Sequence, residues 1–162
     1  MPSMTLPQSW RNLLLAIHVA AAVGVLGADL VLLTFGVAGV AGADPLTIYP
    51  AARLAGVYVV APLALVTLAT GLPLGLLTPW GLFTYWWVTI KLAIVLVLTG
   101  AVLFVLVPSL GATAAAVSGA GPRLETGQLL PLMLAPAVAS SLLLVALLLA
   151  VFKPGWRLRT LR

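Results

Sequence analysis

The stretch Leu13–Leu33, LLLAIHVAAAVGVLGADLVLL, decides the fold, because it is long and apolar enough to span a bilayer as a helix. It contains the chain's only histidine, His18, and a carboxylate, Asp29, at membrane depth. At about 100° per residue, four positions fall on one stripe of this helix, namely His18, Ala22, Val25 and Asp29. A charge facing lipid is costly, so we expect the stripe to face the protein interior or a water-filled cavity, where it marks a candidate site.

The composition is that of an integral membrane protein. Of 162 residues, 63% are hydrophobic and 7% are charged, whereas a soluble domain has roughly 45–50% apolar residues. Four uncharged windows are long enough for a spanning helix, and they cover residues 12–28, 54–90, 92–122 and 126–152. We therefore predict an all-α fold, a bundle of four transmembrane helices that forms a single domain over residues 1–162.

The predicted helices cover about residues 11–35, 52–77, 84–107 and 129–152. The first is predicted to be retained rather than cleaved as a signal peptide, because its apolar run continues to Ala43. Pro62 is expected to kink the second helix by freeing the carbonyl of Tyr58, and Pro108 is expected to end the third. The Ala-, Gly- and Ser-rich residues 109–128 are predicted to form the longest loop, and a mobile one.

The net charge of +5 resides at predicted helix ends, where anionic lipid headgroups and the positive-inside rule explain it. We therefore predict a lipid bilayer as the surrounding partner and no nucleic-acid partner. If four helices alternate, six basic residues lie on one side, against Arg53 and Arg123 on the other, which predicts cytoplasmic termini (N-in/C-in). The six are Arg11, Lys91, Lys153, Arg157, Arg159 and Arg162.

Familiar soluble-enzyme chemistry has no basis in the sequence. The absence of cysteine excludes disulfides, thiolate metal sites and covalent haem attachment. One histidine and three methionines do not make a self-contained copper or zinc site, so no metal site is predicted. No Walker loop, HExxH or GxGxxG occurs. A Ser-His-Asp triad would need His18 and Asp29 on neighbouring elements, whereas they lie about 16 Å apart along one helix.

His18 and Asp29 are the candidate catalytic residues, and each has a structural alternative. His18 is a haem or metal ligand, a proton carrier, or a hydrogen-bonded packing residue. Asp29 is an acid/base group or cation ligand, or else the partner of Arg53 in an ion pair. By depth, Asp29 is within reach of Arg53, Tyr58 or Ser140. The sequence leaves these alternatives open.

Lys91 enters the membrane from the same side as His18. It lies four residues after Trp87, so it either snorkels back to the headgroups or shares a pocket with His18 as a second cofactor-binding residue. Thr67 offers a hydroxyl, and Trp86 belongs to an aromatic belt at the membrane surface. We take four side chains as candidate substrate-binding residues: Tyr58, Thr67, Trp86 and Ser140.

Several segments resemble a group of uncharacterised bacterial four-helix membrane proteins. They are the runs Ala16–Val19 and Val23–Ala28, the hairpin Leu76–Phe83, Tyr85–Val88, Lys91–Leu92 and Val151–Pro154. The Thr-Pro-Trp-Gly-Leu-Phe hairpin and the aromatic-Trp-Val and lysine that follow are the most specific part. Members often have Trp where this chain has Val25. The resemblance implies a multi-pass protein of the bacterial cell membrane and no particular activity.

A second, weaker similarity is to the four-helix membrane family of haem-binding protoporphyrinogen oxidases. A histidine on helix 1 and a lysine on helix 3 matter in that family, and they match His18 and Lys91. This similarity implies haem b or another porphyrin as a cofactor. The family's Leu-Pro-Arg motif after helix 1 is missing after Asp29, and so are the nearby tyrosine and histidine.

Three functions therefore compete. The first is an enzyme or binding protein for a lipophilic small molecule in an intramembrane cavity, with acid/base chemistry at Asp29. The second is a haem-binding redox protein with His18 as axial ligand. The third is a non-catalytic assembly or accessory subunit, in a homo-oligomer or with a partner membrane subunit, that docks through the small residues Ala20, Gly24 and Ala28.

Overall fold

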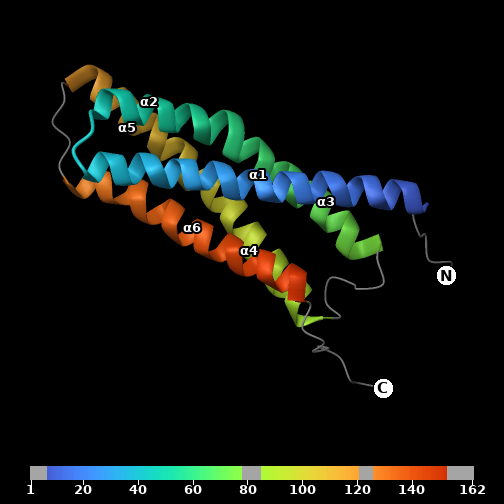
Figure 1. Ribbon diagram of the computed structural model, residues 1–162. Coiled ribbons are helices and arrows are strands. Elements are labelled where there is room, and N and C mark those ends of the chain that lie inside the picture. Colours follow the sequence, from blue (N-terminus) through green and yellow to red (C-terminus); the bar gives the residue numbers. More distant parts are fainter. Residues whose placement is uncertain (1–6, 78–84, 121–125, 153–162) are drawn as a thin grey trace.

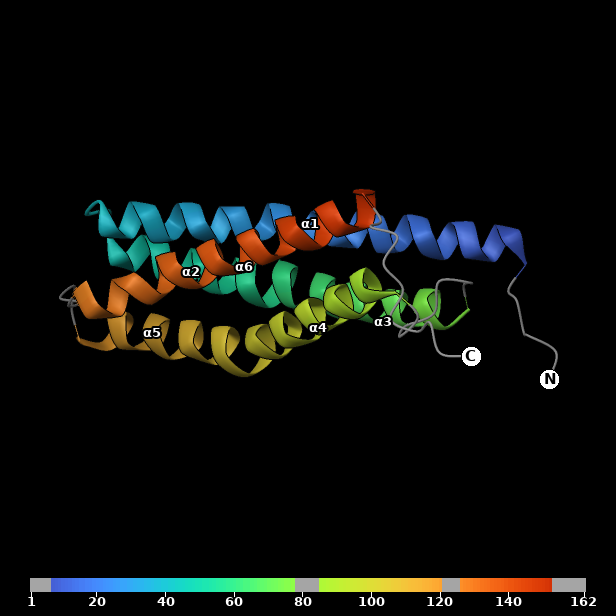
Figure 2. The ribbon, with the colours of Figure 1, turned by 90° about the horizontal axis from the view of Figure 1, so that it is seen from below.

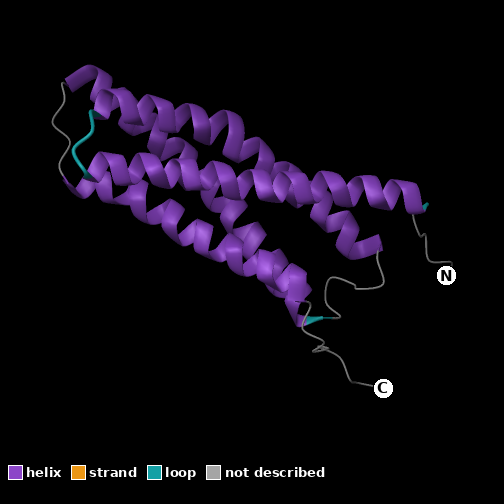
Figure 3. Cartoon of the chain, in the orientation of Figure 1, coloured by secondary structure: helices purple, strands orange, loops and turns teal. Residues whose placement is uncertain are grey.

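The chain folds into four long apolar helical spans. The computed structural model describes residues 7–77, 85–120 and 126–152 (Figures 1 and 3). The first span is α1 (Gln8–Val40), and the second joins α2 (Pro45–Ala55), η1 (Gly56–Val60) and α3 (Ala61–Leu77). The third joins α4 (Trp86–Ala101), η2 (Val102–Leu106) and α5 (Val107–Ala120), and the fourth is α6 (Thr126–Phe152). Each is long and apolar enough to cross a membrane, so the predicted fold class is confirmed.

A sharp turn separates the first two spans. Gly42 has a φ of 94°, a left-handed conformation that costs glycine nothing, and the Ala43 amide donates back to the carbonyl of Ala38, as in a Schellman motif. Asp44 then caps α2 by accepting from the Leu46 amide and the Thr47 hydroxyl. The second span therefore begins at Pro45, earlier than the predicted residue 52.

The third span continues past Pro108, which corrects the prediction that it ends there. Residues 109–120 are helical in α5, so the prediction of a loop over residues 109–128 is wrong for these residues. A π-helical turn, η2, precedes Pro108, and η1 precedes Pro62 in the same way. The amides of Ala61 and Val107 each donate five residues back, to Gly56 and Val102. Pro62 and Pro108 therefore each follow a wider turn, whereas Pro73 and Pro136 lie within α-helical segments.

The four spans are closely packed at one end and diverge at the other (Figures 1 and 2). At the packed end α1 contacts α2, and α2 contacts α5. Beyond these contacts, α1 packs on α3 and α6, and α4 packs on α3 and α6. The diverging end is where α1 begins and α6 ends (Figure 1), and we call it the open end.

The buried core lies at the packed end. It consists of Leu32, Ile48, Tyr49, Ala52, Val60, Leu110, Ala114, Val117 and Leu132. Gly36 lets α1 and α6 approach there, because a Cβ at this position would collide with the carbonyl oxygen of Leu132 and lie 2.5 Å from Met133 Cα. This end of the bundle is therefore filled, whereas the open end is not.

Several sequence predictions concern residues outside the described ranges. They are the hairpin around Thr78–Thr84, the charged residues Arg123 and Glu125, and the basic residues from Lys153 to Arg162. The orientation of the bundle in the membrane therefore stays a prediction.

Candidate functional site

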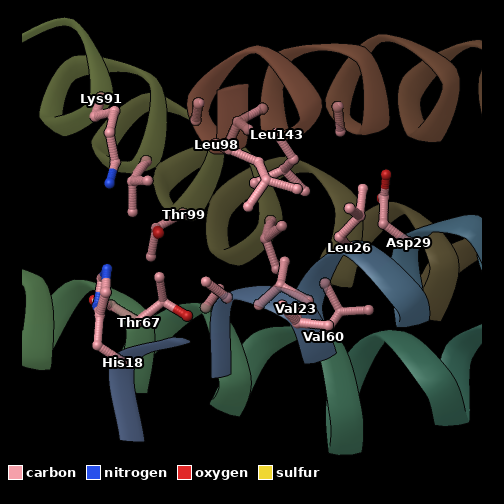
Figure 4. Close-up of a pocket in the computed structure, with 18 of the residues that line it drawn as sticks. His18, Val23, Leu26, Asp29, Val60, Thr67, Lys91, Leu98, Thr99 and Leu143 are labelled. Carbon is pink, nitrogen blue, oxygen red and sulfur yellow. The ribbon is translucent and has the colours of Figure 1, made fainter. Parts of the chain in front are cut away.

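A cavity of about 130 Å³ lies among the four spans, and we call it the deep cavity. Most of its lining is apolar, and polar side chains lie at its two ends (Figure 4). His18, Thr67 and Lys91 are at one end and Asp29 is at the other (Figure 4). Val60 belongs both to this lining and to the buried core. The deep cavity therefore ends, beside Asp29, against the packed end of the bundle.

A second cavity of about 900 Å³, the vestibule, adjoins the deep cavity on the side of the open end. The two linings share seven residues: His18, Val19, Thr67, Lys91, Val95, Leu147 and Ala150. The vestibule also includes Arg11 and Asn12 from the start of α1, and Tyr85 and Trp87 from the start of α4. His18 and Lys91 thus lie where the wide space meets the narrow one.

His18 is fixed against α3. Its Nδ1 lies 3.0 Å from the carbonyl oxygen of Thr67 and 3.0 Å from Oγ1 of Thr70. A carbonyl oxygen can only accept, so Nδ1 is the protonated nitrogen in this contact. The ring lies over Gly71, where an added Cβ would be 2.8 Å from His18 Cε1. In the neutral ring Nε2 is consequently left as an acceptor.

Asp29 is 4% exposed and joins α1 to α6. The hydroxyl of Ser140 donates to its Oδ2 over 2.6 Å. Of the three partners predicted by depth, the structure pairs Asp29 with Ser140. Tyr58 is 73% exposed and Arg53 is exposed beside Gly111. A buried carboxyl group with a hydroxyl partner, at the end of an apolar cavity, is placed to exchange a proton with a bound molecule.

Lys91 takes part in the shared lining rather than lying only at the surface. Its side chain and that of His18 extend toward one another from α4 and α1 (Figure 4). Thr67 belongs to both linings. Trp86 is 51% exposed, whereas its neighbour Trp87 is buried and lines the vestibule. Tyr58 and Trp86 therefore lie away from the site.

Sequence reasoning missed several polar contributors, three of which bear on the site. Thr99 is buried in the deep cavity, Thr70 contacts His18, and Arg11 lines the vestibule. Helical spacing along the third span does predict the position of Thr99. Counting from Lys91 in steps of three or four residues leads along one face of the third span, through Val95 and Leu98/Thr99, to Val102. All of these line the deep cavity.

The site combines apolar walls with the polar side chains of His18 and Lys91 where the two cavities meet. No family model, curated protein or solved structure matches the chain. The functional argument therefore depends on the geometry. Within the described residues, no group of three or more His, Cys, Asp or Glu side chains lies close enough to bind a metal ion.

A porphyrin is compatible with one part of the site only. An axial histidine commonly donates its second ring N–H to a backbone carbonyl, and the contact from His18 to Thr67 has this form. The deep cavity is close in size to a cavity of about 150 Å³ that holds benzene, so it is too small for a macrocycle. A haem group would have to occupy the vestibule.

Proposed function

We propose that this protein binds a lipophilic small molecule inside a bacterial cell membrane, in the joined vestibule and deep cavity. The observation that supports this most is that the vestibule and the deep cavity share seven lining residues, so that the two adjoin between the open end and the buried carboxyl group of Asp29. Ligand sites typically combine such apolar walls with a few convergent polar groups and volumes of about 300–1,000 Å³. The vestibule, at about 900 Å³, falls within that range.

The polar residues divide between the two ends of the ligand. His18 and Lys91 orient its polar end, and Thr67 lies beside them in both linings. Asp29, held by Ser140, faces the far end. If the protein is an enzyme, Asp29 is the group that donates or accepts a proton, because it is the acid/base side chain at the inner end of the cavity.

The first test fills the deep cavity without changing its polar groups. Ala139 lines the deep cavity, and Ala135, one turn earlier on α6, is exposed. We expect Ala139→Phe to remove a small molecule that co-purifies with the protein from its own host in mild detergent, as measured by native mass spectrometry. Ala135→Phe should retain it. Equal retention of the molecule in both variants would contradict a ligand in this cavity.

A second experiment separates an enzyme from a binding protein. Asp29→Asn retains the size of the side chain and removes its acid/base capacity. If Asp29 is catalytic, the variant should accumulate unreacted substrate, so the mass of the bound molecule should differ from that in the wild type. If the protein only binds, the same molecule should be present in both, with altered occupancy at most.

The haem-binding alternative has one favourable observation, the hydrogen bond between His18 Nδ1 and the Thr67 carbonyl. It requires a Soret band that is lost in His18→Ala. The accessory-subunit alternative has less support, because part of the small-residue ridge is used within the chain. A Cβ at Gly24 would lie 3.0 Å from the side chain of Leu63 on α3.

A further inference from the structure

We infer that the ligand is a single-chain amphiphile with an anionic head group, which binds head-outward at Lys91 and Arg11 with its chain directed toward Asp29. This inference rests on the proposed function and specifies the class of ligand. The charge of the vestibule, the size of the deep cavity and the position of Asp29 each support it independently.

The charged side chains that line the vestibule, among the described residues, are all of one sign. Its lining includes the basic side chains of Arg11 and Lys91 and, among the described residues, no acidic one. Trp87 and Tyr85 flank these cations from α4. Two cations on one lining attract an anion placed between them. Carboxylate and phosphate head groups are thus the complementary chemistry, and charge-assisted hydrogen bonds would fix them.

The size of the deep cavity limits the ligand to one chain. Its volume of about 130 Å³ is close to that of a cavity that accommodates a single benzene ring. The end of one unbranched or isoprenoid chain has those dimensions, whereas a second acyl chain or a fused ring system does not. The head group and the rest of the chain then occupy the vestibule, which is about 900 Å³.

The position of Asp29 sets the orientation. Its carboxyl group, 4% exposed, lies at the inner end of the deep cavity. An anionic head group placed there would bring two acidic groups together in a low dielectric, which is strongly unfavourable. The opposite orientation places the head group beside Lys91 and the apolar chain along the apolar walls.

The test compares four probes with the same fourteen-carbon chain. They are tetradecanoate, tetradecyl phosphate, tetradecanol and tetradecyltrimethylammonium, and each is titrated against the delipidated full-length protein in nanodiscs, with empty nanodiscs to correct for partitioning. We expect one or both anions to bind about tenfold or more tightly than the alcohol, as a charge-assisted contact provides, and the cation to bind weakest. The better anion identifies the head group as carboxylate or phosphate.

Matched variants test whether the preference for the anionic probes over the alcohol arises in the vestibule. Lys91→Gln should reduce the preference for the anion, with Arg11 left to supply the remainder, while binding of the alcohol stays within about twofold, because only one charged contact is lost. Lys91→Arg should restore the preference. Arg53→Gln, an exposed basic residue on α2 that lines neither cavity, should have no effect.

The outcomes are distinguishable from failure of the proposed function. If the alcohol binds as tightly as both anions, the inference about the head group is wrong, although a lipophilic ligand stands. If the anions bind tightly but Lys91→Gln retains the full preference, the assignment to Lys91 is wrong. If none of the four probes binds above the empty nanodiscs, the inference is contradicted, and loss or retention of the co-purified molecule in Ala139→Phe decides the proposed function separately.

Discussion

The hydrogen bond between Ser140 and Asp29 is the residue-scale contact on which the inner end of the cavity depends. We expect Ser140→Ala to lower the free energy of unfolding by about 1–3 kcal/mol, because it leaves a buried carboxyl group without its donor. Reversible unfolding in mixed micelles measures this loss. The neighbouring Ser141 is an internal control, since it is exposed and bonds only its own helix at Ala137. An equal loss in Ser141→Ala would show that the contact with Asp29 contributes nothing.

At the same scale, the sequence predicts which polar residues face inward but not all of their partners. The helical spacing of His18 and Asp29 places them on one stripe, and both line the deep cavity. The depth of Asp29 in the membrane is compatible with three partners. It does not distinguish Ser140 from the other two, because depth does not define how each helix is rotated about its axis. The contact between His18 and Thr67 uses a backbone carbonyl, and no side-chain pattern in the sequence encodes such an acceptor.

At the scale of elements, the crossing of α1 and α6 depends on Gly36. We expect Gly36→Ala to destabilise the bundle by about 1–3 kcal/mol, because the added Cβ would meet the α6 backbone, which can move only if the helices separate. The matched control is Gly27→Ala on the same helix, where an added Cβ meets nothing within 4 Å. Unfolding of both variants in the same micelles tests this, and a Gly36 variant as stable as the Gly27 variant would contradict the close crossing.

The number and type of the elements follow from the sequence, but their ends do not. Four apolar windows predict four spans, and four are present. The start of the second span at Pro45 depends on Asp44 as a cap, and an Asp-Pro pair is typical of such a helix start. Pro108 predicts a helix end, since a proline removes a helical hydrogen bond, whereas the helix continues through it after the π-turn η2.

At the scale of the whole molecule, the packing is asymmetric along the bundle. The core fills the end that holds α2 and α5, and the cavities occupy the end where α1 begins. The proposed ligand would therefore reach Asp29 from the open end or from the lipid beside it. The basic residues Arg11 and Lys91 of that end predict that it faces the cytoplasm, so the ligand would exchange with the inner leaflet.

This orientation is open to direct measurement, because the chain has no cysteine and an introduced one is unique. Asn12 lies at the open end and Ala43 in the turn at the packed end, and both are exposed. We expect an impermeant maleimide to label Ala43→Cys in intact spheroplasts, and Asn12→Cys only after permeabilisation. The reverse pattern would place the vestibule on the outer side, and the anionic amphiphile would then have to be a molecule of the outer leaflet. Labelling of both variants in intact cells would contradict a span between the two positions.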